Sequence, residues 1–221
     1  MIADVEALLD LADEQIAEVE SIYEATLREH QVSPRLKALI KNVIENYRSA
    51  LDFVANAAAE RHGKTGSAKV YWPYAKIPAE FTKWFDKTMP GVRRNRPDLA
   101  DAWERFQPYQ PGFEWIAALV ELANANKHRE LTPQTRTETV RREVNGPGGS
   151  VSWGPGVTFG SGVSIMGEPV DPRTQRTAST VETIYVDWVF DTPKASALNT
   201  LKTIQTGARP MLQELCSLAD L

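Results

Sequence analysis

The sequence predicts an α+β fold, in which a mainly α-helical bundle carries a small antiparallel β-sheet inserted before the last helix. Apolar residues recur at steps of three and four in the first part of the chain and again near its end, a spacing typical of amphipathic helices. Between these parts they alternate at a spacing near two, which is typical of strands. We therefore expect a helical bundle over 1–133, a β insert over 134–192 and a C-terminal helix over 193–221, packed together as one compact domain.

Two long helices are expected first. The apolar stripe of 2–27 predicts a long amphipathic helix. Ser33 followed by Pro34 is a typical helix start, with serine as the N-cap and proline in the first turn. The second apolar stripe begins there and ends near His62 and Gly63, so the second helix is expected over about 34–62.

The rest of the bundle combines a loop with shorter helices. Two prolines among aromatic residues over 66–79 indicate a loop that its aromatic side chains hold against the bundle. Short helices are expected over 80–87 and 98–106, and a longer one over 113–130.

Strand signals then replace the helical spacing. Residues 135–145 alternate threonine, valine and charges, and 146–167 combine glycine and serine with apolar residues at a spacing near two. Residues 181–190 place four large apolar side chains on one face of a strand. Helical spacing returns over 195–218, where a glycine and a proline predict an interruption.

Composition excludes several classes of protein. The chain has 221 residues and one cysteine, so no internal disulfide is expected and a reducing compartment is predicted. Its apolar runs are shorter than the roughly 20 residues of a membrane span, and its acidic N-terminus is unlike a secretory signal. The three histidines lack carboxylates at ligand spacing. We therefore expect a cytoplasmic protein with no metal, no cofactor and no membrane partner.

Charge is unevenly distributed along the chain. Residues 1–29 hold nine acidic residues and one arginine, whereas the remainder carries a net charge of +4. Basic residues in that remainder gather at 35–48, 93–96 and 127–142. Two interpretations stay open: an acidic helix face with ordinary surface charges elsewhere, or a basic groove that accepts a polyanion.

A pair of opposite charges lies inside the apolar stripe of the second helix. Arg48 and Asp52 are four residues apart and therefore share one helix face. Their simplest role is an internal ion pair that ties helices together.

A polar segment also ends the 113–130 helix. Asn124 and His128 share a face there, next to Lys127 and Arg129. Cations at this end complement the helix dipole, which is their simplest role.

The chain resembles widespread uncharacterised bacterial and phage proteins with an "LRSALDHL … QPY … KHR" pattern, through its segments "YRSALDFVANAA", "FQPYQP" and "LVELANANKHRELT". Those proteins resemble distant members of the HEPN superfamily of helical nucleotide-binding and RNase domains. The resemblance covers about residues 1–135. It implies a HEPN-like bundle, a homodimer, and RNA or a nucleotide as partner in a phage-defence or toxin context.

The resemblance also implies a site. HEPN RNases carry an arginine followed four to six residues later by a histidine; Arg48 fits the arginine, but Phe53 stands where the histidine is expected. Metal-independent RNA cleavage would then need Arg48 to stabilise the charged phosphorane and His128 to act as the base, with Asp52 orienting its imidazole. The expected ligand-binding residues are Asn124, Lys127 and Arg129.

Two functions follow from these residues. The first is a HEPN-like, metal-independent endoribonuclease, or a degenerate relative that binds RNA or a nucleotide. The alternative is a non-catalytic interaction module, in which Arg48, Asp52 and His128 form a structural polar network and the β insert carries the partner surface.

Overall fold

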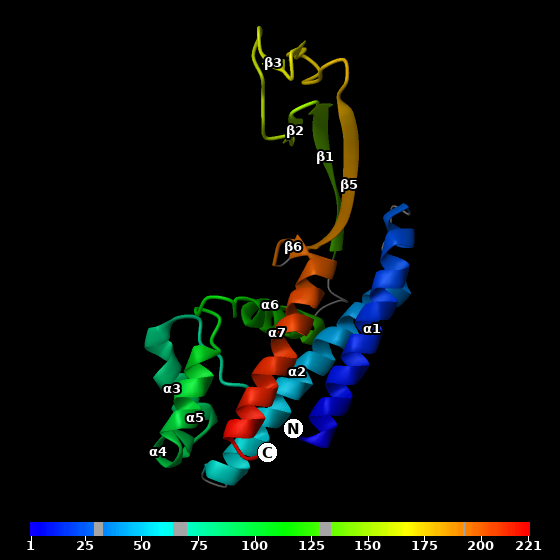
Figure 1. The fold of residues 1–221 in the computed structure, drawn as a ribbon. Coiled ribbons are helices and arrows are strands. Elements are labelled where there is room, and N and C mark those ends of the chain that lie inside the picture. Colours follow the sequence, from blue (N-terminus) through cyan, green and yellow to red (C-terminus); the bar gives the residue numbers. More distant parts are fainter. Residues whose placement is uncertain (29–32, 64–69, 129–133, 192) are drawn as a thin grey trace. The chain divides into compact units, whose positions relative to one another are not determined.

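The computed structural model describes residues 1–28, 33–63, 70–128, 134–191 and 193–221. The fold is α+β, as predicted, with helices over more than half of the chain and a curled antiparallel sheet (Figure 1). The chain divides into two compact units: a helical unit of residues 1–135 and 189–221, and a β unit of residues 136–188. Among the described residues, no helix is both long and apolar enough to cross a membrane.

Three long helices form the helical unit and run side by side (Figure 1): α1 (Ala3–Arg28), α2 (Pro34–His62) and α7 (Ala197–Leu218). The buried residues of α1 repeat every three or four positions and confirm the predicted stripe: Val5, Leu9, Ala12, Ile16, Val19 and Tyr23. The start of α2 is also as predicted, because the Ser33 hydroxyl accepts a hydrogen bond from the backbone N–H of Leu36 at 3.1 Å.

Two shorter helices follow close to where the sequence predicts them, α3 (Pro78–Thr88) and α5 (Pro97–Arg105), and a short helix that it does not predict, α4 (Val92–Asn95), lies between them in the chain. An aromatic cluster holds them together. The ring of Trp103 lies 5.6 Å from the ring of Trp72 and 6.1 Å from that of Phe85, measured between centroids. These separations are typical of stabilising aromatic pairs.

The segment that precedes α3 is anchored by aromatic burial, as predicted, and by one buried amide. Trp72 is fully buried in the aromatic cluster. The side chain of Gln107 accepts a hydrogen bond from the backbone N–H of Ala75 at 2.9 Å and donates one to the carbonyl of Pro73 at 3.1 Å. Gln107 thereby replaces the backbone partners that an irregular segment lacks.

α6 (Trp115–His128) packs on α2 and α7. Trp115 lies so close to Gly207 of α7 that a Cβ there would be 2.5 Å from its indole nitrogen. α7 continues through Gly207 and Pro210, so the predicted interruption is wrong, and the kink that these residues also predict stays a prediction. Glycine at 207 serves a close helix–indole contact rather than a break.

The β unit is organised around β1 (Gln134–Gly146), which lies between β2 (Gly149–Trp153) and β5 (Val181–Phe190). The strands at both ends of this unit confirm the sequence prediction. β1 and β2 form an antiparallel hairpin in which Val144 is opposite Val151. A small core of its own supports the unit: Val144, Trp153, Ile165 and Val170, with Phe159 and Val163 packed against it.

Short strands complete the sheet structure. β3 (Ser164–Ile165) and β4 (Glu168–Pro169) form a two-residue ladder within the β unit. In the helical unit, the last two residues of β5 pair with β6 (Ala195–Ser196), directly before α7.

Candidate functional site

Arg48 and Asp52 form the ion pair that their spacing predicts. The Arg48 Nη2 atom lies 3.1 Å from Asp52 Oδ1, and the two side chains are only 13% and 18% exposed. Asp52 Oδ1 also accepts a hydrogen bond from the backbone N–H of Trp72 at 2.7 Å. The pair therefore joins α2 to the segment that carries the aromatic cluster.

Asn56, one turn after Asp52, strengthens the same junction. Its side-chain amide donates hydrogen bonds to the carbonyl of Asp52 at 2.7 Å and to the carbonyl of Val70 at 2.6 Å. Its side-chain oxygen accepts one from the backbone N–H of Val70 at 3.3 Å. Two polar residues of α2 thus hold successive backbone groups of the incoming segment.

The guanidinium of Arg48 retains one donor. Its Nη1 atom is buried and has no hydrogen-bond partner within the described part of the chain. A buried cationic N–H without an acceptor is costly.

The remaining predicted site residues lie on α6 or beyond it. Asn124 is exposed, whereas Asn126, two residues later, is buried. The side chains of Lys127 and His128 and the whole of Arg129 lie outside the described residues. The convergence of Arg48 with His128 therefore stays a prediction. Phe53, which stands where the HEPN resemblance expects histidine, is 47% exposed on α2.

A second polar cluster, not singled out from the sequence, joins α1, α2 and α7. Asp13 Oδ1 accepts hydrogen bonds from the Tyr47 hydroxyl at 2.6 Å and from the Gln205 amide at 3.1 Å, and its Oδ2 accepts one from Arg209 at 2.8 Å. Burial alone would raise the pKa of Asp13, but the hydrogen bonds from Tyr47, Arg209 and Gln205 hold it below its usual value. Burial and the bond to Asp13 raise the pKa of Tyr47. This cluster holds α1, α2 and α7 of the bundle together.

The exposed side of α3 carries aromatic and charged residues together. Glu80, Lys83, Trp84 and Lys87 share the exposed face of α3, next to the face that carries its buried rings. Trp84 is 40% exposed, and the Lys87 ammonium lies 4.8 Å from the centroid of its ring. Such a contact shows that one face of the indole attracts a cation.

A pocket of about 350 Å³ opens beside Trp84 and is lined by Tyr74, Lys76 and Glu80. Lys76 is paired with Glu121 at 3.5 Å. Burial and the nearby Glu121 charge raise the pKa of Tyr74, so its phenol stays protonated. The pocket therefore combines an aromatic wall with hydrogen-bond donors and an acceptor.

The basic group at 93–96 divides into structural and free cations. Arg93 stacks 5.1 Å from the ring centroid of Phe85 and donates to Asp86 at 2.9 Å. Arg96 donates to Asp98 at 2.7 Å and to the carbonyl of Leu218 at 2.6 Å. Arg94 is exposed and forms no ion pair with any described residue, and the same holds for Lys83 and Lys87.

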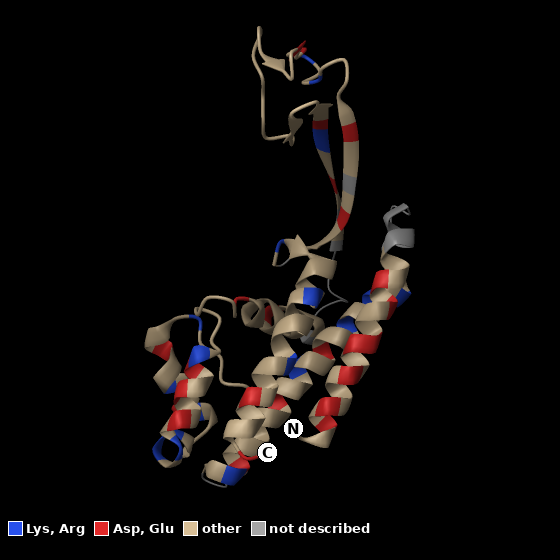
Figure 2. Ribbon diagram, viewed as in Figure 1, with Lys and Arg blue, Asp and Glu red and all other residues tan. Residues whose placement is uncertain are grey.

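Figure 2 shows the contrast between the two sides of the helical unit: the short α4 helix is mostly blue, whereas red predominates on α1. Between Lys76 and Arg96 the chain has six basic and two acidic residues. The sequence reveals the basic group, but not that Trp84 of the preceding helix is exposed. The spacing of α3 contains part of that signal, because it groups Trp84 with Glu80 and Lys87, at i−4 and i+3, on the polar face of the helix.

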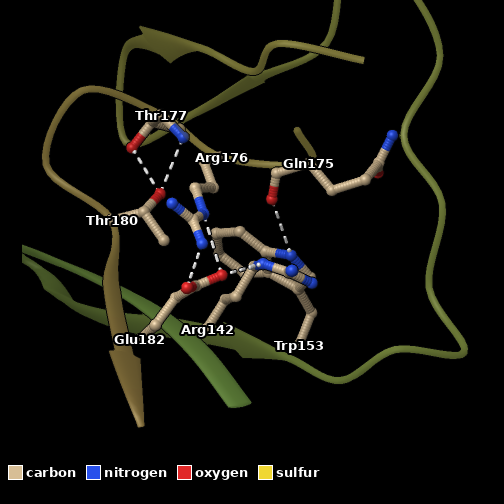
Figure 3. Close-up of polar contacts among 7 residues, drawn as sticks. All are labelled: Arg142, Trp153, Gln175, Arg176, Thr177, Thr180 and Glu182. Carbon is tan, nitrogen blue, oxygen red and sulfur yellow. Dashed lines mark hydrogen bonds and ion pairs between the residues drawn. The ribbon is translucent and has the colours of Figure 1, made fainter. Parts of the chain in front are cut away.

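The β unit contains a cluster of polar contacts centred on Glu182 (Figure 3). Its carboxylate accepts hydrogen bonds from Arg142 Nε at 2.7 Å and Arg176 Nε at 2.8 Å. Partial burial acts to raise the pKa of Glu182, but the bonds from Arg176 and Arg142 lower it. On the same side, the Trp153 indole donates to the carbonyl of Gln175 at 3.2 Å. These contacts hold the loop before β5 in place. Their role is structural, and nothing in their geometry indicates a catalytic group.

Metal-ligating and nucleophilic groups offer no competing site in the described part of the chain. No three His, Cys, Asp or Glu side chains there gather as metal ligands. Cys216 is buried, and burial raises the pKa of its thiol. Comparison of the chain with protein-family models, with curated proteins and with solved structures gives no match.

Proposed function

We propose that this protein binds RNA or a nucleotide without cleaving it, as a HEPN-like relative that lacks a working catalytic pair. The hydrogen bond from the Trp72 N–H to Asp52 carries the proposal. A carboxylate that accepts from a backbone N–H and pairs with Arg48 has a structural role in the fold, and this role accounts for its place in α2 without a catalytic base. The side chain of Phe53, at the position expected for histidine, has no group that can act as an acid or a base.

Binding itself is supported by the distribution of charge. The acidic residues of α1 are partly neutralised by ion pairs, Glu18 with Arg35 and Glu20 with Lys202. By contrast, three cations near α3 and α4 face solvent without a carboxylate partner in the described residues: Lys83, Lys87 and Arg94. Cations left free in this way are available to phosphates.

A direct experiment measures binding and cleavage on one RNA. A labelled single-stranded RNA is titrated with the protein in EDTA, and binding is read by fluorescence anisotropy. The same samples are then run on a denaturing gel. We expect saturable binding that weakens as salt rises, with the RNA intact. Absence of binding at low salt would refute the proposal and leave the interaction-module alternative.

One observation favours a second function, metal-independent RNA cleavage: the Nη1 atom of Arg48 is buried and has no hydrogen-bond partner among the described residues, and a guanidinium N–H can stabilise the charge of a phosphorane. If the chain cleaves RNA, cleavage in EDTA is lost in a His128→Ala variant, because one general base typically contributes about 10²–10⁴-fold in rate. Arg48→Lys is the companion variant, since it keeps the charge but removes the guanidinium fork. Equal amounts of intact RNA with wild type, variants and buffer would exclude cleavage.

A further inference from the structure

The tryptophans of the chain differ sharply in exposure. All six belong to described residues, and five of them are at most 5% exposed, whereas Trp84 is 40% exposed. An exposed indole gives up part of the free energy that burying its apolar surface would contribute, and that the other five indoles do contribute. An exposed aromatic ring next to cations is the combination that single-stranded nucleic acids use, with bases on the ring and phosphates on the cations.

The groups around Trp84 match the parts of a nucleotide. The pocket beside the indole has Tyr74 as a second aromatic wall. Lys83 and Lys87 lie on the same helix face as Trp84, and Arg94 follows in α4. None of the three cations is used in an ion pair with a described residue.

Glu80 gives the pocket an acceptor. Its carboxylate lines the pocket together with Lys76. Carboxylates accept hydrogen bonds from the exocyclic amino groups of bases, so a negative charge at this position suits a base, whereas the lysines suit the phosphates. The pocket volume, about 350 Å³, lies within the range of small-ligand sites.

We infer that the α3 face is the binding surface for a single-stranded polynucleotide, with one base seated against Trp84 and Tyr74 and the adjacent phosphates on Lys83, Lys87 and Arg94. This inference rests on the proposed function and places it away from the Arg48 and Asp52 pair. Recognition of this kind is tolerant of sequence, because every base has a stacking face.

The exposed indole also supplies the assay. A single-stranded RNA of roughly 12 nucleotides, within the usual range of site sizes, is titrated while tryptophan fluorescence is followed. Stacking on Trp84 quenches the emission of the one exposed indole, and the quenching disappears in Trp84→Phe while most of the binding is kept. Trp84→Ala weakens binding about tenfold, the typical effect of losing one stacked base. Parallel titrations use single-stranded DNA of the same sequence and an abasic strand. Because the abasic strand has no base to stack on the indole, we expect it to bind Trp84→Ala and wild type with equal affinity.

The cations are tested with a charge-matched control. The double variant Lys83→Ala/Lys87→Ala is compared with Arg35→Ala/Lys202→Ala, which removes two exposed positive charges elsewhere on the helical unit. We expect the first to weaken binding and to reduce the slope of log affinity against log salt by about 1.4, at roughly 0.7 for each lysine lost from a single-strand contact, and the second to have little effect.

The possible results separate the two proposals. If the wild type binds and the α3 variants bind within about twofold of it, this inference is overturned while the proposed function stands. If the two double variants weaken binding equally, bulk charge and not this surface accounts for it, and the inference is again overturned. If the wild type binds no strand, both fail. Thermal melts of each variant confirm that these exposed substitutions leave the fold intact.

Discussion

Asp52 accepts a hydrogen bond from the backbone N–H of Trp72 at 2.7 Å, across twenty residues of sequence. The same oxygen pairs with Arg48, so one carboxylate connects the middle of α2 with the aromatic cluster. The sequence allows a catalytic role for this ion pair, whereas its contacts in the fold are structural. It fixes the segment on which the pocket residue Tyr74 lies.

Removing either partner of this pair is expected to destabilise the protein. Asp52→Ala leaves a mostly buried guanidinium and a backbone N–H without their acceptor, at a cost of about 2–4 kcal/mol. For a chain of this size that lowers Tm by roughly 4–16 °C. Differential scanning fluorimetry measures the shift.

The matched control is Asp86→Ala, which removes the exposed partner of Arg93 and should change Tm much less. An Asp52→Ala variant as stable as wild type would show that the pair contributes nothing to the fold. That result would reopen a catalytic role for Asp52.

Acid stability should depend on Asp13. Its pKa is lowered in the folded protein, so its contribution to stability is complete above the pKa of the unfolded chain. That contribution is lost as pH falls through the folded value. Wild type should therefore lose Tm more steeply than Asp13→Asn below about pH 4, while the variant is less stable at neutral pH. Parallel Tm profiles for the two proteins would disprove this role.

Local signals in the sequence were sufficient for most elements, whereas contacts between distant elements were not predictable. The start of α2 follows from Ser33 and Pro34 because capping is a local hydrogen bond. Asp13 sits beside the apolar stripe of α1, and nothing near it in sequence shows that Tyr47 and Arg209 will supply donors. The same applies to Asp52, whose partner Trp72 comes from an irregular segment.

The continuity of α7 shows how tertiary contacts override propensity. Glycine and proline both disfavour helix interiors, yet α7 extends through Gly207 and Pro210. The close contact with Trp115 explains why residue 207 is a glycine, since any side chain there would collide with the indole. A sequence reading cannot anticipate that partner from α6.

That contact predicts an unusual response to a helix-favouring substitution. Gly207→Ala would gain about 1 kcal/mol of helix propensity in an exposed helix. Here the new methyl group would lie 2.5 Å from the Trp115 indole nitrogen, so overpacking should instead cost about 1–3 kcal/mol. Thermal melts should show a lower Tm for Gly207→Ala, with Thr206→Ala on the exposed side of α7 as the control. A higher Tm would mean that Trp115 does not pack on α7 in this way.

The polar contacts of Glu182 should keep the neighbouring loop of the β unit ordered. Glu182→Ala removes the acceptor shared by Arg142 and Arg176, so the loop that includes Gln175 loses one of the contacts that hold it beside β5. Because this loop lies far from α3 in sequence and belongs to the separate β unit, the effect should stay local. Hydrogen exchange over residues 170–180 should become faster in Glu182→Ala than in Glu143→Ala, while exchange in α2 stays unchanged. Protection that is the same in both variants would show that the small core around Trp153, and not the ion pairs, orders the loop.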